Sequence, residues 1–463
     1  MKESTGTGSG GAREPIGFVG LGAMGAPMAR WLLSRGYDVI VSDLNGKAVE
    51  DLVNHGARAA ATLTELASAA STVFTCLPSL GALRKVALGP EGLQHGTSIS
   101  TLVDFSTTGP AFARELGAAL AARKIDLLDA PITGNVVTAG NGKLGIMCSG
   151  PSATFGRTRP VLEDLASTAL LYLGEENGRA QTLKLLNNLL SATGMAVACE
   201  AMILGVKAGL APEAMLEAIN ASDASSSATR NKFARSVLAR RFDFGARMAI
   251  TAKDTSLAVG VVEELGVPAW IARRVQQIWG FAASQGGAER DGTSLITYLE
   301  PWAGIEVEGG RPAQATDSPG AARLMERLVG AVSATLLAVA CEAFVAGSKA
   351  GLDPITMTRI LGIETGRNFA SSHVLPEQVA TRKFAYGKSL GAALSDLDFV
   401  ADEARRLGVT TWVLDGTRAL YRLAAGLGRG GEDMSRLATY YEAWAGAEVR
   451  IPPSCHEEQG GRA

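Results

Sequence analysis

The chain of 463 residues carries one long segment twice. Residues 178–307 recur as residues 320–449 at a fixed offset, and roughly a third of the aligned positions are identical. Glu200, for example, aligns with Glu342. Each segment begins with a long run in which apolar residues recur every three or four positions, the spacing typical of a helix. The sequence therefore predicts two tandem all-α domains that arose by internal duplication.

The residues before the repeat alternate between short apolar strands and helical runs. A strand at residues 15–20 leads directly into a glycine-rich turn and then into a helical run. Such a GxGxxG turn lets the pyrophosphate of a dinucleotide approach the free N–H groups of the helix N-terminus. The turn consists of Gly20, Leu21, Gly22, Ala23, Met24 and Gly25.

Asp43 ends the second predicted strand, 23 residues after Gly20. A carboxylate at this place accepts hydrogen bonds from the adenosine ribose and repels a 2′-phosphate. No arginine follows in residues 44–46, so the sequence favours NAD over NADP.

Further α/β alternation predicts a Rossmann-like domain over residues 15–177. Ligands of such sheets bind beyond the carboxyl ends of the strands, where the connecting turns lie. One of these turns, Thr133-Gly134-Asn135, offers N–H groups and a hydroxyl that suit a carboxylate. The remaining predicted strands cover residues 71–77, 101–105, 124–130, 144–148 and 169–173.

Two polar residues stand out in the first helical segment. Lys184 and Asn188 are four residues apart on a predicted helix over 181–210, so they share one face, one turn apart. A lysine can move a proton, and an amide can hold or polarise a hydroxyl.

The two helical segments differ at these polar positions and agree at packing positions. This contrast favours a functional role for Lys184, Asn188 and Lys253 over drift of surface residues. In the second segment, Lys184 is replaced by Glu326, Asn187 by Val329, Asn188 by Gly330 and Lys253 by Ser395, whereas Asp254 is kept as Asp396.

Composition excludes several classes of protein. With 47% hydrophobic residues, 19% charged residues and a net charge of −2, nothing suggests nucleic-acid binding. Five scattered cysteines without a CxxC pair indicate reduced thiols and a cytoplasmic location. The four histidines show no metal-ligand spacing, and no apolar run is judged long enough to span a membrane.

The predicted domain boundaries complete this interpretation. A flexible tail at residues 1–14 lacks the apolar core of a signal peptide. The first helical domain then covers residues 178–308, a polar linker 309–319, the degenerate second domain 320–450 and a disordered tail 451–463.

With these motifs in order, the chain resembles the β-hydroxyacid dehydrogenases, the group that includes 3-hydroxyisobutyrate dehydrogenase. The resemblance covers roughly residues 15–300. It rests on the glycine-rich turn, residues 104–110, 129–135 and 184–188, and Lys253-Asp254.

The resemblance implies a role for each matching residue. Lys184 would be the catalytic acid/base of a hydride transfer between NAD and a small β-hydroxy acid or its semialdehyde, and would need a pKa lowered towards neutrality. Asn188 would bind the reacting hydroxyl. Ser106, Thr133, Gly134 and Asn135 would belong to the substrate site, whereas Leu77, Pro78, Thr107 and Lys253 would contact the cofactor.

Two departures from the family pattern accompany the match. The family usually has Ser-Gly-Gly where this chain has Thr133-Gly134-Asn135, which narrows or re-aims the carboxylate pocket. The second helical segment resembles the duplicated domain of 6-phosphogluconate dehydrogenase, without matching sugar-phosphate residues. In the family the helical domain packs on a second subunit, so here the two segments are expected to pack on each other, with a homodimer through other surfaces left open.

Three alternatives to this function stay open at the sequence level. One is a non-catalytic dinucleotide-binding or scaffold protein of the same fold. The others are an imine reductase, although those enzymes typically lack the lysine present here, and an enzyme like 6-phosphogluconate dehydrogenase.

Overall fold

The computed structural model describes residues 14–310, 319–362 and 365–451. The predicted tails and most of the 309–319 linker lie outside these residues. The chain forms two compact units, Met1–Gln181 and Thr182–Ala463, so their division falls close to the predicted boundary at residue 177. Both helical segments belong to the second unit.

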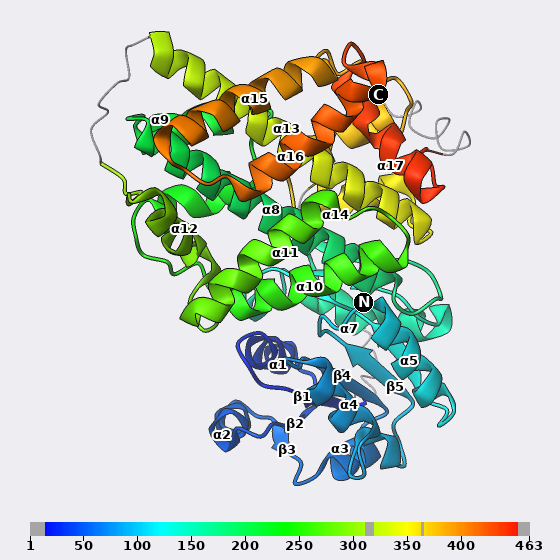
Figure 1. Ribbon diagram of the computed structural model, residues 1–463. Coiled ribbons are helices and arrows are strands. Elements are labelled where there is room, and N and C mark those ends of the chain that lie inside the picture. Colours follow the sequence, from blue (N-terminus) through cyan, green and yellow to red (C-terminus); the bar gives the residue numbers. More distant parts are fainter. Residues whose placement is uncertain (1–13, 311–318, 363–364, 452–463) are drawn as a thin grey trace, which may run out of the picture. The chain divides into compact units, whose positions relative to one another are not determined.

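A parallel six-stranded sheet forms the centre of the first unit, in the order β3-β2-β1-β4-β5-β6, which confirms the Rossmann-like fold (Figure 1). The order reverses beside β1, and this switch point is where such sheets bind ligands. The strands are β1 (Ile16–Val19), β2 (Val39–Ser42), β3 (Arg58–Ala59), β4 (Thr72–Thr75), β5 (Thr101–Asp104) and β6 (Asp126–Asp129).

A second, three-stranded sheet follows in the order β7-β8-β9, so the later predicted strands do not extend the main sheet. Its strands are β7 (Ile132–Thr133), β8 (Gly145–Cys148) and β9 (Ala169–Tyr172). The helices of the unit are α1 (Gly25–Ser34), α2 (Gly46–Asn54), α3 (Leu63–Ala69), α4 (Leu80–Leu88), α5 (Pro110–Ala121), α6 (Val136–Gly140) and α7 (Ser152–Leu165).

The strands of the main sheet are apolar because both of its faces are covered by buried side chains. On one face, Phe74 packs edge-on against Phe18 and Phe105, with ring centroids 6.1 and 5.2 Å apart. These rings fix the three central strands whose carboxyl ends carry the polar turns.

The second unit is helical, and the two segments place their helices in the same order (Figure 1). The first segment contains α8 (Arg179–Lys207), α9 (Pro212–Asn220), a π-helix (Thr229–Val237), α10 (Met248–Glu264), α11 (Trp270–Ala282) and α12 (Ile296–Ala303). The second contains α13 (Pro319–Lys349), α14 (Pro354–Leu361), a π-helix (Ala370–Val379), α15 (Leu390–Leu407), α16 (Trp412–Ala424) and α17 (Leu437–Ala445).

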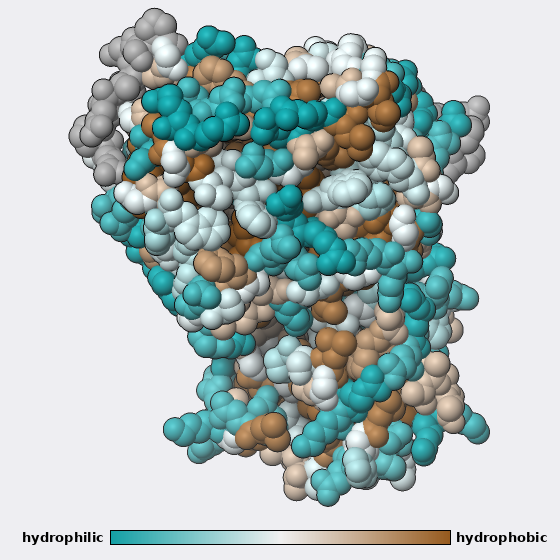
Figure 2. All heavy atoms as spheres, in the orientation of Figure 1, coloured by the Kyte–Doolittle hydropathy of each residue, from teal (hydrophilic) through white to brown (hydrophobic). Residues whose placement is uncertain are grey.

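The first helix of each segment, α8 or α13, is long and strongly apolar. By length and composition, both α8 and α13 could cross a membrane, contrary to the expectation that no run is long enough. However, 94% of the most apolar stretch of each is buried inside the protein, as in a core helix. On the face drawn in Figure 2, hydrophobic residues appear as separate patches among hydrophilic ones.

Two buried glutamates hold the segments together in a reciprocal way. The carboxylate of Glu200 on α8 accepts the N–H groups of Trp412, Val413 and Leu414 at 2.7, 2.8 and 3.0 Å, at the start of α16. Glu342, its counterpart on α13, accepts those of Ile271 and Ala272 at 2.7 and 3.0 Å, at the start of α11. Each carboxylate thereby satisfies free N–H groups of a helix in the other segment.

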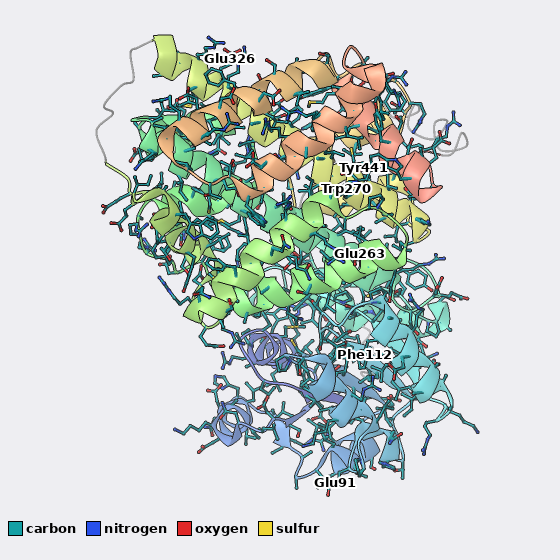
Figure 3. The ribbon with its side chains drawn as sticks, viewed as in Figure 1. Glu91, Phe112, Glu263, Trp270, Glu326 and Tyr441 are labelled. Carbon is teal, nitrogen blue, oxygen red and sulfur yellow. The ribbon has the colours of Figure 1, made fainter. Side chains whose placement is uncertain are left out.

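A β-bridge between the segments follows the same symmetry. Ser226 forms a β-bridge with Asn368, which is its own counterpart in the second segment. A residue that pairs with its own equivalent marks a twofold relation between the two surfaces. Trp270 packs edge-on against Trp444 at 6.3 Å, and Figure 3 shows Trp270 and Tyr441 in this region.

Burial raises the pKa of Glu200 from 4.5 to about 7, although the N–H groups of Val413, Leu414 and Trp412 oppose the shift. Burial raises the pKa of Glu342 similarly. In the unfolded chain such a glutamate loses its proton near pH 4.5, whereas in the fold it keeps the proton up to about pH 7. The stability it contributes is therefore complete below pH 4.5 and is lost as the pH rises to about 7.

We expect the stability of the wild type, relative to a Glu200→Gln variant, to fall by on the order of 1–3 kcal/mol between these two pH values. Urea unfolding at a series of pH values measures this difference. The exposed Glu217→Gln variant is the control and should show no such change. A wild type that gains stability over Glu200→Gln as the pH rises would show that the carboxylate is ionised in the fold throughout this range.

Candidate functional site

The glycine-rich turn after β1 leaves space at one glycine and none at the other two. Gly20 has a φ of +99°, and a Cβ there would lie 2.4 Å from the Cys76 carbonyl oxygen. A Cβ on Gly25 would lie 1.9 Å from the Gly20 carbonyl oxygen. At Gly22, by contrast, a Cβ would meet nothing within 4 Å. The outer glycines thus allow the backbone to pack, while open space at Gly22 fits the approach of a pyrophosphate.

Asp43, at the end of β2, is tied to this turn. One carboxylate oxygen accepts the N–H of Leu21 at 2.6 Å, and the other accepts the N–H of Asn45 at 2.7 Å. The glycine-rich turn and the predicted ribose-binding acid are therefore together in one unit. These residues fit a dinucleotide, which would supply the hydride acceptor or donor of a redox reaction.

The turns after β4 and β5 are joined through Ser106. Its hydroxyl donates to Asp104 at 2.6 Å and accepts the N–H of Leu77 at 2.9 Å. Thr75 also donates to Asp104, at 2.8 Å. Burial raises the pKa of Asp104 to about 7, against the hydrogen bonds from Ser106 and Thr75. This geometry favours a positioning role for the buried Ser106, since its proton is already donated within the protein.

Gln181 fixes the segment that contains Thr107. Its side-chain oxygen accepts the N–H groups of Thr108 and Gly109 at 2.9 and 3.1 Å, and its amide nitrogen donates to the Ser106 carbonyl at 2.9 Å. The segment from Ser106 to Gly109 is therefore held in one conformation beside Pro78 and Leu77 of the neighbouring turn.

Thr133 and Gly134 begin the turn that the sequence assigns to a carboxylate. Thr133 is buried, whereas Gly134 and Asn135 are exposed. Gly134 has a φ of +136°, and a Cβ there would lie 2.5 Å from the hydroxyl oxygen of Thr138. Asn135 caps α6, because its side-chain oxygen accepts the N–H groups of Val137 and Thr138, both at 3.0 Å. Its amide oxygen is thus occupied by the helix.

In the second unit, Lys184 and Asn188 lie one turn apart on α8. Lys184 is only 8% exposed. Asn188 donates to Asp254 of α10 at 2.7 Å, and Lys253 forms an ion pair with the same carboxylate at 3.1 Å. Asp254 therefore joins two of the predicted site residues, Asn188 and Lys253. Buried polar side chains that serve no packing purpose are expected at a functional site.

The equivalent place in the second segment is closed. A Cβ on Gly330, the counterpart of Asn188, would lie 2.1 Å from a carboxylate oxygen of Asp396. Arg327 and Lys388 both form ion pairs with Asp396, at 2.5 and 3.0 Å. Glu326, the counterpart of Lys184, is exposed near the start of α13 (Figure 3). The second segment thus has an acid at the same position, Asp396, and the cations Arg327 and Lys388 lie next to it.

Asn187, next to Asn188, contacts the second segment directly. Its amide nitrogen donates to the Thr365 hydroxyl at 3.0 Å, and its oxygen accepts the N–H of Gly366 at 3.0 Å. The second segment therefore holds α8 immediately beside the polar pair.

Sequence reasoning missed Gln181, Asp104 and Asn187 as members of this arrangement. Asp104 begins the motif at residues 104–110, but no role was assigned to it, and its bonds to the Thr75 and Ser106 hydroxyls are tertiary contacts. Gln181 acts through hydrogen bonds to backbone groups, which no motif reveals. For Asn187 a signal existed, because the second segment has Val329 at the same position.

Comparisons with known families match nearly the whole described chain. The NAD-binding domain of 6-phosphogluconate dehydrogenase matches residues 15–174. The family described as NAD-binding of NADP-dependent 3-hydroxyisobutyrate dehydrogenase matches twice, at residues 178–299 and 320–441.

Individual relatives agree with these families. The 2-(hydroxymethyl)glutarate dehydrogenase of Eubacterium barkeri is 34% identical over 297 residues, which are 64% of this chain and 98% of that protein. The 3-hydroxyisobutyrate dehydrogenase of Pseudomonas aeruginosa is 39% identical over 45% of this chain and 69% of its own length. The crystal structure of 3-hydroxyisobutyrate dehydrogenase from Salmonella typhimurium covers 62% of this chain and 100% of its own, with 29% identity and a TM-score of 0.56.

Proposed function

Because the chain belongs to the β-hydroxyacid dehydrogenase family, and is thus a dinucleotide-dependent oxidoreductase, we propose that it interconverts a small β-hydroxy acid and the matching semialdehyde or keto acid. The observation that carries this proposal is the pair on α8, the buried Lys184 and the partly buried Asn188 held by Asp254. The relatives named above support the substrate class, since their names describe enzymes of hydroxy acids.

Lys184 takes the hydroxyl proton during oxidation and returns it during reduction. Asn188 holds the reacting oxygen through its amide. The bond to Asp254 fixes the orientation of that amide, because its nitrogen donates to the carboxylate at 2.7 Å. The side-chain oxygen of Asn188 accepts the Asn187 amide at 3.4 Å and, because an amide oxygen has two lone pairs, it can accept a second donor such as the substrate hydroxyl.

The turn from Thr133 to Asn135 binds the substrate carboxylate. Its support is chemical: the Thr133 hydroxyl, the Gly134 N–H and the Asn135 amide N–H₂ are donors, whereas the Asn135 backbone N–H is donated to Thr138 at 2.8 Å. Lys253 contributes to the cofactor site, and Asp254 limits its charge through the 3.1 Å ion pair. A scaffold protein without catalysis would have no use for a buried lysine next to an oriented amide.

NAD is the preferred cofactor in this proposal. Its support is that Asp43 follows β2 and has both carboxylate oxygens hydrogen-bonded beside the glycine-rich turn, the place where an acid in such folds accepts the adenosine ribose hydroxyls.

The second helical segment is structural, and it arose by duplication of the first. The match of one family description to both segments supports this origin. The reciprocal glutamate contacts support a packing that replaces, inside one chain, the surface that a second subunit supplies elsewhere. Each chain then has a single active site.

Replacing Lys184 with alanine tests the proton transfer. We expect turnover to fall on the order of a hundredfold or more, with NADH binding nearly unchanged, because the acid/base group is lost and the cofactor turn is intact. The matched control is Glu326→Ala at the equivalent position of the second segment, which should keep turnover within about twofold. Turnover is followed by NADH absorbance with a panel of hydroxy acids and semialdehydes. Near-normal turnover in Lys184→Ala would show that Lys184 is not the acid/base group of the reaction.

Replacing Asp43 with asparagine tests the cofactor preference. Asparagine keeps an oxygen for the N–H of Leu21 but removes the charge that repels a 2′-phosphate. We expect the ratio of kcat/KM with NADH to that with NADPH to fall about tenfold or more. A wild-type enzyme that uses NADPH better than NADH would contradict the assignment of Asp43.

A further inference from the structure

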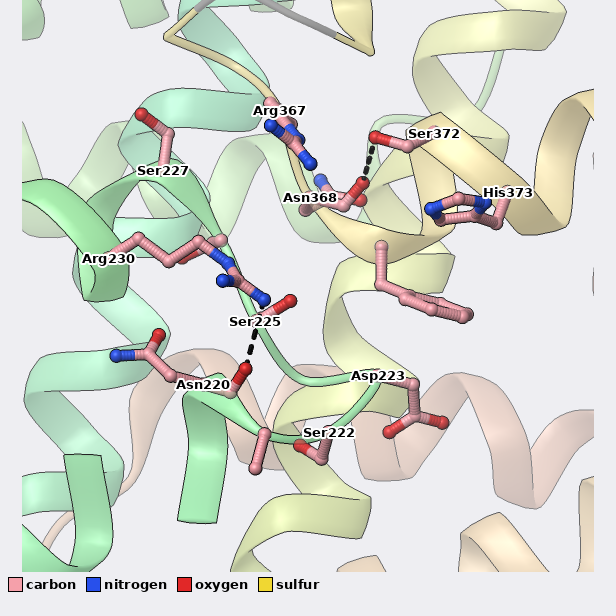
Figure 4. Close-up of a pocket in the computed structure, with 13 residues that line it drawn as sticks. Asn220, Ser222, Asp223, Ser225, Ser227, Arg230, Arg367, Asn368, Ser372 and His373 are labelled. Atoms are coloured by element: carbon pink, nitrogen blue, oxygen red, sulfur yellow. Dashed lines mark hydrogen bonds between the residues drawn. The ribbon is translucent and has the colours of Figure 1, made fainter. Parts of the chain in front are cut away.

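A cavity of about 320 Å³ lies where Ser226 and Asn368 pair, on the twofold relation between the two helical segments (Figure 4). Its volume is at the small end of the range for ligand sites. None of the residues assigned to catalysis or cofactor binding lines it. The backbone beneath it is rigid, because Ser227 N–H donates to the Arg367 carbonyl at 2.7 Å and Phe369 N–H donates to the Ser225 carbonyl at 3.1 Å.

Each segment contributes one arginine to this cavity. Arg230 comes from the first segment and Arg367 from the second, and both side chains are exposed at the opening. The counterpart of Arg230 is Ser372, and the counterpart of Arg367 is Ser225, and both serines also line the cavity. The duplicated positions have thus diverged so that one arginine stands on each side.

A buried donor without a partner lies in the same cavity. Asn368 is only 2% exposed, and its side-chain nitrogen has no hydrogen-bond partner among the described residues. Its oxygen is already used, since it accepts the N–H of Ser371 at 2.9 Å. An unsatisfied buried N–H₂ group destabilises the fold, and an oxygen of a ligand would satisfy it. Figure 4 shows Arg230, Arg367 and Asn368 around the same opening.

The other polar side chains that line the cavity do not cancel the positive charge of the two arginines. Asp223 is the one carboxylate among the lining residues, and the Tyr386 hydroxyl donates to it. His373 lies 3.1 Å from Glu377 on the same helix. Arg230 donates one N–H to the Asn220 carbonyl at 2.9 Å. The side-chain oxygen of Asn220 has no hydrogen-bond partner among the described residues. The lining therefore contains two guanidinium groups and one amide donor, against a single carboxylate that already accepts a hydrogen bond.

We propose that this cavity binds a small oxyanion, the carboxylate or phosphate group of a metabolite, through Arg230, Arg367 and the side-chain nitrogen of Asn368. Guanidinium groups suit such planar or tetrahedral oxygens, because they donate parallel N–H bonds. The same stretch of chain also holds Asn187 of α8 through Thr365 and Gly366, so the site adjoins the helix that carries Lys184.

Isothermal titration of the full chain without cofactor tests this site, and it makes no use of turnover. The two probes are inorganic phosphate and succinate, which separate a phosphoryl ligand from a carboxylate one. We expect at least one of them to bind with one site per chain. The variants Arg230→Ser and Arg367→Ser install the residue that the other segment carries, and each should weaken binding about tenfold or more.

The control is Arg359→Ser, an exposed arginine on α14 that does not line the cavity, and it should bind as the wild type does. Both arginines are exposed, so their replacement should leave the thermal midpoint of unfolding unchanged. Failure of both probes to bind at about 10 mM would overturn the proposal. Binding that is equally strong in both arginine variants would also overturn it, because the anion would then occupy another site.

Discussion

The reciprocal capping by Glu200 and Glu342 is the constraint on which the helical unit depends. A buried carboxylate is costly unless donors surround it, and here the donors are the N–H groups that open α11 and α16. Each carboxylate belongs to one segment and each helix to the other, so neither segment can satisfy its own groups alone. This requirement is a physical reason for the two segments to share Glu200 and Glu342 at equivalent positions, although they differ at Lys184 and Asn188.

Within this framework the two segments differ in the surroundings of one buried acid. In the first, Asp254 orients Asn188 and pairs with Lys253. In the second, Asp396 approaches Gly330 so closely that no side chain fits, and Arg327 and Lys388 neutralise it. A buried acid needs partners, and in the second segment the two cations Arg327 and Lys388 take this role for Asp396.

The sequence predicted what depends on local pattern. The strands of the main sheet, the glycine-rich turn with Asp43, and α8 with Lys184 and Asn188 on one face all follow from short-range spacing. The sequence did not predict the separate sheet of β7–β9, because β7 has only two residues, Ile132 and Thr133, too few to show a pattern. The partners of Glu200 lie 212 to 214 residues away in the chain. Nor does spacing reveal that Gln181 fixes the turn at Ser106–Gly109, since its bonds go to the backbone.

The second segment packs on the first through bonds that each segment lacks by itself. This dependence is measured most directly by the molar mass and turnover of a chain that ends at residue 310, compared with the full chain by light scattering and NADH absorbance. We expect the shortened protein to aggregate or to pair with another copy, because α11 and the carboxylate of Glu200 lose their partners. A shortened chain that is monomeric, soluble and fully active would contradict it.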